Sequence, residues 1–324
     1  MARTRYAPDR GLTARMTVTM FLLGLVFVAF VALIIGIGAV THASDAAIVF
    51  FALVLGGGLG FVSLFYSDKI ALAAAGAREV TPKEAPELHA IVDRLCALAD
   101  MDKPRVAIAP AAMPNAFATG RNSKNSVLCV TQGLMSKQLD LSPEELEGVL
   151  AHELSHVAHK DVQVMTIAGL LAIIAGLMVR FAFYSELFGG GRGRGGNNQN
   201  AALIMFGIMA ASIVVYAVSF LLIRLLSRYR ELAADRSGAL LTGQPSALKS
   251  ALIKVSGGMN RIPTKDLRAS EAMNAFYFAP AMKLHGGEGG GLSRVFSTHP
   301  SLDRRIQELD KIQKQLGQVA PREL

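Results

Sequence analysis

The segment His152-Glu153-Leu154-Ser155-His156 contains two histidines four positions apart, with a glutamate directly after the first. In a helix, residues four apart lie on one face a turn apart, so both imidazoles could bind one metal ion. A zinc ion held by two neutral imidazoles and a third protein ligand keeps a fourth position for water, lowers the pKa of that water to about 7 and polarises a peptide carbonyl. Glu153 could accept the proton of this water as general base and pass it to the leaving amine. The pattern predicts a peptidase that carries one zinc ion per chain.

A third ligand must come from another part of the chain, and Glu231 follows directly after a long apolar run. The histidine segment directly precedes another such run, so a hairpin of the two runs would bring both segments to the same membrane face. We therefore predict that Glu231 completes the ligand set. Asp235, one turn further on, could orient a ligating histidine. The alternative for Asp235 is a solvated helix charge that pairs with Arg228 or Arg236.

The helix that carries the histidine pair has clear start signals in the sequence. Ser142 can cap the helix and Pro143 suits its first position. Glu144 and Glu145 place negative charge in the first turn, at the positive end of the helix dipole. These signals favour a helix built into a folded domain over a surface helix that carries two incidental histidines.

The other elements predicted around this helix are mainly helical, with one small sheet. Apolar residues at helical spacing predict amphipathic helices over 86–100 and 300–315. Two β-rich stretches at 106–109 and 126–131 predict strands, and 115–119 could form the edge of their sheet. The expected fold class is a mainly α, α+β catalytic domain in which a small β-sheet accompanies the active-site helix.

The composition indicates an α-helical integral membrane protein. Of 324 residues, 52% are hydrophobic, and the mean hydropathy of +0.38 is rare for a soluble domain. The formal net charge of +8 would suit nucleic acid, but the chain has no nucleic-acid module, so we expect no nucleic-acid partner. Cys96 and Cys129 lack the pair spacing of a metal site or a disulfide framework, and free buried thiols are expected.

Four apolar segments are long enough to form transmembrane helices, since a bilayer core needs about 20 helical residues. They cover 16–40, 46–66, 162–184 and 201–226. Arginines precede the first segment, whereas the loop 41–45 after it has neither Lys nor Arg. The positive-inside rule therefore places both termini and the active site at the cytoplasmic face of a multi-pass protein.

This topology divides the chain into four parts. The first transmembrane hairpin is 1–66 and the second is 162–226. The two halves of the peptidase domain are 67–161, which contains the histidine helix, and 227–324.

Several motifs in one order resemble the HtpX family of integral-membrane zinc metallopeptidases, relatives of the membrane CAAX prenyl proteases. Besides two N-terminal spans, they are Pro114 to Gly120, His152 to His156, Glu231 to Asp235, and Ser297-Thr298-His299-Pro300 with Arg304. The resemblance implies a zincin-like domain of gluzincin type, with His152, His156 and Glu231 on zinc and Glu153 as base. It also implies a place in the bacterial cytoplasmic (inner) membrane and a stress-related role in degrading misfolded or damaged membrane proteins.

The same resemblance implies roles for further residues. Asn115, Ala116 and Phe117 are similar to a substrate-binding edge strand, to which an extended peptide could add through backbone hydrogen bonds. The alternative is a turn asparagine before a buried phenylalanine. His299 and Arg304 are similar to the C-terminal motif of the family, and either stabilise the tetrahedral oxyanion or hold the site together.

Two other functions compete with the endopeptidase. A prenyl-protein processing peptidase would remove a lipidated C-terminal tripeptide, and would need a larger intramembrane chamber than four spans readily enclose. A non-catalytic metal-binding scaffold or chaperone would hold hydrophobic clients without hydrolysis, although every expected catalytic residue is present. The expected partners are polypeptide substrates, above all membrane proteins, and the lipid bilayer; the oligomeric state is not predicted.

Overall fold

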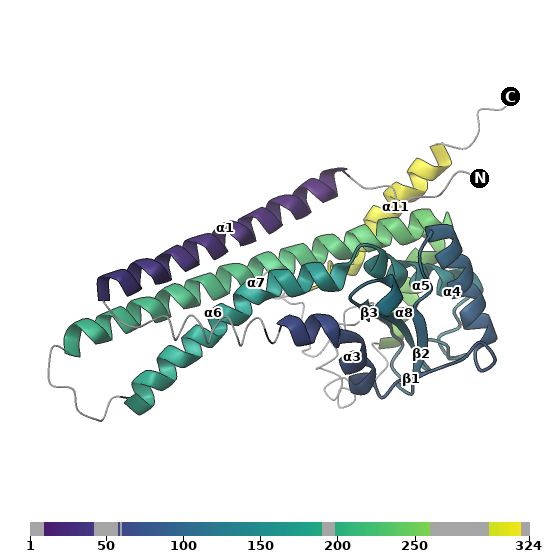
Figure 1. Ribbon diagram of the computed structural model, residues 1–324. Coiled ribbons are helices and arrows are strands. Elements are labelled where there is room, and N and C mark those ends of the chain that lie inside the picture. The colour runs from purple at the N-terminus through teal and green to yellow at the C-terminus, as the bar shows by residue number, and fades with distance from the viewer. Residues whose placement is uncertain (1–9, 42–57, 59, 190–197, 260–297, 319–324) are drawn as a thin grey trace. The chain divides into compact units, whose positions relative to one another are not determined.

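The computed structural model describes residues 10–41, 58, 60–189, 198–259 and 298–318 (Figure 1). The chain divides into two compact units. The first unit comprises Met1–Thr13, Leu64–Gln163 and Ser227–Leu324, and the second comprises Ala14–Ser63 and Val164–Leu226. The first unit therefore joins stretches that lie far apart in the sequence.

Three long apolar helices supply most of the second unit. These are α1 (Arg10–Thr41), α6 (Asp161–Gly189) and α7 (Asn198–Thr242). Phe30 of α1 packs with Ile174 and Ala175 of α6, and Leu23 of α1 packs with Ala168 of α6 and Leu226 of α7. The first residues of α6, Asp161 to Gln163, and the last part of α7, from Ser227 on, belong to the first unit.

Two helical stretches of the described chain are long and apolar enough to cross a membrane, Arg10–Phe30 and Met209–Thr242. A third candidate arises if α5 (Pro143–Ala158) and the following Asp161–Leu177 form one span bent by 55°. Phe21 on α1 and Phe206 on α7 expose 70% and 64% of their surface, respectively. Large apolar side chains that face outwards along such helices are typical of helices in contact with lipid.

The predicted spans 16–40, 162–184 and 201–226 lie within α1, α6 and α7. The predicted span 46–66 falls largely outside the described residues. A membrane protein with at least two candidate spans is therefore supported, whereas the count of four spans and the cytoplasmic orientation stay predictions.

A four-stranded mixed sheet lies in the first unit. Its strands are β1 (Arg78–Glu79), β2 (Arg105–Ala109), β3 (Ala116–Gly120) and β4 (Ser126–Thr131), in the order β1-β2-β4-β3. β2 and β4 are parallel, whereas β1 pairs with β2 and β3 pairs with β4 antiparallel. β3 is therefore an edge strand of this sheet, as predicted for 115–119.

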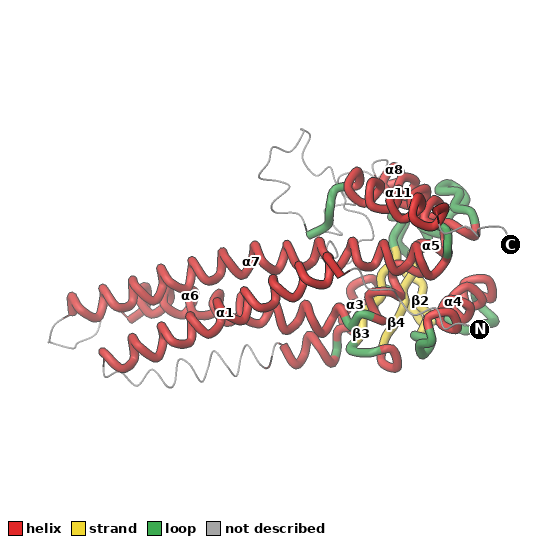
Figure 2. Tube along the Cα trace, turned by 90° about the horizontal axis from the view of Figure 1, so that it is seen from above, coloured by secondary structure: helices red, strands yellow, loops and turns green. Residues whose placement is uncertain are grey.

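Both faces of this sheet are covered by helices of the first unit (Figure 2). The helices of this unit include α3 (Ser67–Ala75), α4 (Pro86–Ala99), α5, α8 (Pro245–Met259) and α11 (Leu302–Gln318). Val106, Leu128 and Val130 pack into the main core with α4 and α5. The intervening Ala107 and Cys129 pack against α3 on the other face. Because side chains of a strand alternate between faces, coverage of both faces explains why every residue of β4 is buried.

The predicted elements of this unit are confirmed with small shifts at their ends. The helix expected over 86–100 is α4, the helix expected over 300–315 is α11, and the two β-rich stretches are β2 and β4. The fold class of a mostly helical protein with a small mixed sheet is also confirmed.

Helix α5 begins as its start signals predict. The Ser142 side chain accepts a hydrogen bond from the Glu145 backbone N–H at 3.2 Å, and the Ser142 N–H donates to Glu145 Oε2 at 2.7 Å. Glu145 also accepts a hydrogen bond from Lys254 of α8 at 2.7 Å. This capping box ties the start of the histidine helix to its neighbour α8.

Candidate metal centre and active site

Three side chains from α5 and α7 converge on one point. His152 and His156 come from α5, Glu231 comes from α7, and one ligand atom of each lies within 4.8 Å of the other two. His152 Nε2 lies 3.2 Å from His156 Nε2. Glu231 places its two carboxylate oxygens 3.5 Å from His156 Nε2 and 3.8 Å from His152 Nε2. The three predicted ligands are therefore brought together by two helices that are far apart in the sequence.

The two nitrogen atoms are spaced as ligands of one metal ion. Bonds of about 2.0–2.1 Å in tetrahedral geometry place ligand atoms roughly 3.4 Å from one another, and the two Nε2 atoms are 3.2 Å apart. Glu231 turns a different oxygen towards each histidine, Oε1 at 3.5 Å from His156 and Oε2 at 3.8 Å from His152. The donor set of two imidazoles and a carboxylate is one that zinc binds in catalytic sites.

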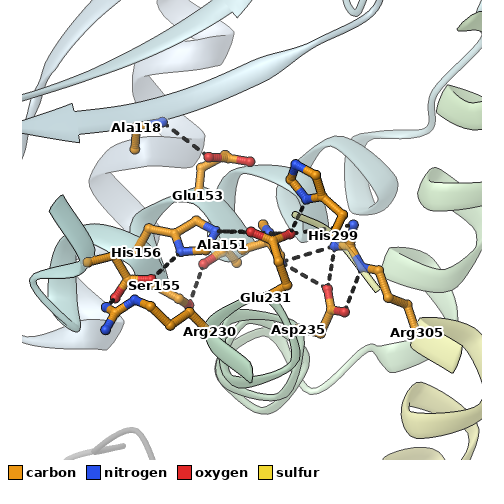
Figure 3. Close-up of polar contacts among 12 residues, drawn as sticks. Ala118, Ala151, Glu153, Ser155, His156, Arg230, Glu231, Asp235, His299 and Arg305 are labelled. Carbon is orange, nitrogen blue, oxygen red and sulfur yellow. Dashed lines mark hydrogen bonds and ion pairs between the residues drawn. The ribbon is translucent and has the colours of Figure 1, made fainter. Parts of the chain in front are cut away.

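His152 is held from behind by a carboxylate. Its Nδ1 lies 2.9 Å from Asp235 Oδ1, and both side chains are fully buried. Asp235 in turn forms a bidentate ion pair with Arg305 of α11, with Nε–Oδ2 and Nη2–Oδ1 distances of 2.7 and 2.6 Å (Figure 3). Asp235 therefore contacts a predicted ligand, as its interpretation as an orienting carboxylate requires, whereas the alternative partner Arg236 contacts Gln315.

His156 is held in the same way by a residue that the sequence analysis did not single out. Its Nδ1 lies 2.6 Å from Asp161 Oδ2, and Asp161 forms an ion pair with Arg230. The available signal was an acidic residue at the point where the histidine helix gives way to the next apolar segment.

These contacts define which nitrogen of each imidazole is directed at a carboxylate. A carboxylate beside Nδ1 accepts a hydrogen bond from it, so we assign an N–H to Nδ1 of each ring and the role of ligand atom to each Nε2. Burial lowers the pKa of His152 to about 4, although the hydrogen bond to Asp235 acts in the opposite direction. With this lowered pKa the His152 ring is neutral at pH 7. Two nitrogen lone pairs and a carboxylate then face one another, an arrangement that a cation between them stabilises.

Glu153 lies next to this cluster on α5. Its side chain is buried, and Oε2 accepts a hydrogen bond of 3.1 Å from the backbone N–H of Ala118 in β3 (Figure 3). Burial raises the pKa of Glu153 to about 8, and the nearby Glu231 carboxylate contributes to this rise. A carboxylate with a pKa close to neutral pH can both accept and release a proton, as general acid and base chemistry requires. A bound cation would lower this pKa.

The edge strand β3 presents alternating backbone groups to its two sides. Thr131 donates its backbone N–H to the carbonyl of Asn115, so Asn115 faces β4. By the alternation of an antiparallel ladder, the backbone groups of Ala116 and Ala118 point away from β4, and the Ala118 N–H does meet Glu153. The Phe117 side chain is buried against the α3 face of the sheet. Of the three predicted substrate-binding residues, Ala116 thus has outward-facing backbone groups, and Ala118 joins it.

The C-terminal motif reaches the site through His299 and Arg305. His299 Nδ1 lies 3.0 Å from Glu231 Oε2, and Arg305 Nη1 lies 3.8 Å from the same oxygen. Arg304 is exposed, and its backbone N–H contacts the Ser301 hydroxyl. Arg305, which the sequence analysis did not single out, shares the buried face of α11 with Leu309 and Ile312, while the predicted Arg304 is turned about 100° from it.

Helices α5 and α7 approach each other closely at the site. A Cβ atom on Gly238 of α7 would lie 2.9 Å from the backbone nitrogen of His152 and 3.1 Å from its Cα. Glycine at this position therefore lets α7 pack directly on the backbone of α5. This contact sets the separation between the histidines on α5 and Glu231 on α7.

Taken together, this is the arrangement of a metal-dependent peptidase: three converging ligand atoms beside a buried glutamate and the edge of a sheet. Residues 82–313 match Peptidase family M48, and the chain belongs to this family. It is 56% identical to "Protease HtpX homolog 1" of Streptomyces coelicolor over 317 residues, which cover 98% of each chain. It is 49% identical to "Protease HtpX homolog" of Moorella thermoacetica over 315 residues, covering 97% of this chain and 98% of that protein. The resemblance to HtpX peptidases is thereby confirmed.

Among solved structures, the crystal structure of S. mikatae Ste24p is similar to this chain. The match has a TM-score of 0.48 and 17% sequence identity, and covers 93% of this chain and 67% of that one.

Proposed function

We propose that this protein is a membrane-embedded, zinc-dependent endopeptidase of gluzincin type that hydrolyses peptide bonds in misfolded or damaged membrane proteins. The observation that carries the proposal is the convergence of His152 Nε2, His156 Nε2 and the Glu231 carboxylate, of which one ligand atom each lies within 4.8 Å of the other two. Membership of Peptidase family M48 and the protease names of the relatives support it.

His152, His156 and Glu231 would hold the zinc ion. A zinc ion bound there supplies Lewis acidity, which polarises the scissile carbonyl and lowers the pKa of a water molecule. The two Nε2 atoms, each on a ring whose Nδ1 faces a carboxylate, and the buried Glu231 carboxylate are the kinds of donor atom that zinc binds.

Glu153 is the proposed proton carrier of the reaction. It lies one residue after a ligand histidine, and its buried carboxylate can accept a proton from the attacking water. The same group then returns the proton to the leaving amine, so that one carboxylate serves both halves of the cycle. The Ala118 N–H holds Oε2 of Glu153 at the edge of the sheet, where a peptide would arrive.

The outward-facing backbone groups of β3 are the proposed site for the substrate backbone. An extended peptide could pair with the N–H and carbonyl of Ala116 and with the carbonyl of Ala118 as an additional strand beyond β3, while the Ala118 N–H stays bonded to Glu153. Such pairing uses only backbone groups, so it requires an unfolded segment but no particular sequence. This requirement agrees with a peptidase that acts on misfolded proteins.

The proposal that the substrates are membrane proteins is based on helix α7. Glu231 lies on α7, within the candidate span Met209–Thr242. A ligand within a stretch that is long and apolar enough to cross a membrane supports loops and partly extracted segments of membrane proteins as the proposed substrates.

The test is cleavage of an unfolded substrate such as casein by the detergent-solubilised full chain, stripped by a chelator and reconstituted with zinc. We expect zinc-dependent cleavage that is lost in Glu153→Gln, which has nearly the shape of the original side chain but cannot accept the proton. Glu147→Gln is the matched control, because Glu147 is a buried glutamate of the same helix that pairs with Arg94 instead of facing the ligands. Equal cleavage by wild type and Glu153→Gln would refute the assignment of Glu153. Binding of clients without any hydrolysis would instead favour the scaffold function.

A further inference from the structure

We propose that Asp161 is a positioning residue for His156 and that Arg230 holds Asp161 in place. This inference rests on the proposed zinc function. One oxygen of Asp161 lies 2.6 Å from His156 Nδ1, and the other pairs with Arg230. Asp161 and Arg230 are both buried, with 7% and 4% of their surface exposed.

The break between α5 and α6 makes the contact between Asp161 and His156 possible. In an unbroken helix, a residue five positions further on lies about 140° around the axis, away from the ring that it follows. α5 ends at Ala158, Lys160 has a φ of 57°, and α6 begins at Asp161. This φ lies in the left-handed region, which non-glycine residues rarely adopt. The strained turn brings the Asp161 carboxylate back to the ring of His156.

Arg230 ties this turn to the helix that carries the third ligand. Besides its ion pair with Asp161, it donates a hydrogen bond of 3.4 Å from Nη2 to the carbonyl of His159. Arg230 directly precedes Glu231 on α7. Arg230 of α7 therefore holds the Asp161 carboxylate that contacts His156, while the next residue, Glu231, supplies a ligand atom.

The expected effect of this arrangement is on metal binding. A carboxylate at Nδ1 keeps the proton on that nitrogen, leaves the Nε2 lone pair for the metal and increases electron donation by the ring. Arg230 is the buried countercharge of Asp161, which fixes the position of the carboxylate beside the ring. The two ligand histidines are then supported alike, His152 by Asp235 with Arg305 and His156 by Asp161 with Arg230.

The test measures zinc affinity of the full chain in detergent by competition with a chromogenic chelator, together with the absorption spectrum of the cobalt-substituted protein. We expect Asp161→Asn to weaken zinc binding about 10–100-fold and to change the cobalt spectrum, since the amide keeps the shape of the side chain but lacks its charge. Asp161→Glu should recover most of the affinity. Arg230→Lys should weaken binding in the same direction by a smaller factor, and carries the test if Asp161→Asn does not fold.

Asp68→Asn is the matched control. Asp68 also lies in the first turn of a helix, is also buried and also pairs with an arginine, Arg105, but it contacts no ligand. Its zinc affinity should equal that of wild type even if its thermal stability falls. Unchanged zinc affinity and cobalt spectrum in Asp161→Asn, or an equal loss of affinity in Asp68→Asn, would overturn the inference. A wild-type protein that binds no zinc would refute the proposed function itself, and this inference with it.

Discussion

Arg305 of α11 donates hydrogen bonds to both carboxylate oxygens of Asp235 on α7, in the interior of the first unit. The distances are 2.7 Å from Nε to Oδ2 and 2.6 Å from Nη2 to Oδ1. Asp235 uses one of these oxygens to contact His152 Nδ1 as well. The C-terminal helix thus acts on a predicted metal ligand through one intervening carboxylate. This relationship distinguishes Arg305 from its neighbour Arg304, which is exposed.

Replacing Arg305 should therefore destabilise the protein, while replacing Arg304 should not. Arg305→Met leaves the buried Asp235 carboxylate without its partner, and loss of one member of a buried ion pair costs about 3–5 kcal/mol. Arg304→Met should stay within about 0.5 kcal/mol of wild type, as expected for an exposed side chain. Thermal unfolding followed by circular dichroism measures the difference, which suits a chain without tryptophan. Equal melting temperatures for the two variants would contradict the role of Arg305.

A methyl group at Gly238 should separate the ligand helices. In Gly238→Ala the new Cβ would lie 2.9 Å from the backbone nitrogen of His152, so α7 must move away from α5. We expect weaker zinc binding and strongly reduced cleavage, because Glu231 moves with α7. Gly257→Ala on α8 is the control, since nothing lies within 4 Å of its Cβ and the exchange should stabilise the helix by roughly 0.5–1 kcal/mol. Zinc titration of both variants tests this prediction. A zinc affinity equal to that of wild type in Gly238→Ala would refute it.

His299 should act mainly through Glu231. Its Nδ1 lies 3.0 Å from Glu231 Oε2, a contact that orients the third ligand. His299→Ala is therefore expected to weaken zinc binding by about tenfold or more, as for other residues that support a ligand. The alternative role, stabilisation of the tetrahedral oxyanion, predicts instead a lower kcat with unchanged zinc affinity. Measuring zinc affinity and kcat on the same preparation separates the two roles.

The buried thiols should react slowly and only at high pH in the folded protein. Burial raises the pKa of Cys129 to about 12, so at pH 8 only about one molecule in ten thousand carries the reactive thiolate, against about a quarter in an unfolded chain. The folded chain keeps a proton that the unfolded chain releases, so Cys129 contributes stability below about pH 8.5 that is lost as pH rises towards 12. In Cys96→Ala, where Cys129 is the remaining cysteine, modification by a thiol reagent at pH 8 should therefore follow unfolding. Rapid modification of the folded variant would show that Cys129 is accessible.

Much of the site could be predicted from the sequence because it depends on local geometry. Two histidines four apart meet on any helix, and the cap at Ser142 and the charges after it indicate that a helix begins there. Strands β2 and β4 could likewise be predicted from the local sequence, because each is a short run of β-forming residues. The apolar segments within α1, α6 and α7 follow from composition and length alone.

The partners of these residues depended on tertiary structure. Asp161 reaches His156 only because the chain turns sharply at Lys160, and no periodicity in the sequence predicts that turn. Whether Arg304 or Arg305 enters the interior depends on which face of α11 packs on the core, a difference of one residue that a motif alone leaves open.

The sequence by itself determined the kinds of groups available, two imidazoles and several carboxylates on helices of defined phase. Only the tertiary structure decided which carboxylates approach which imidazoles. The physical reason is that side-chain spacing within a helix is set by the geometry of the helix itself. The distance between α5 and α7 is set instead by packing at residues such as Gly238, which are not ligands themselves.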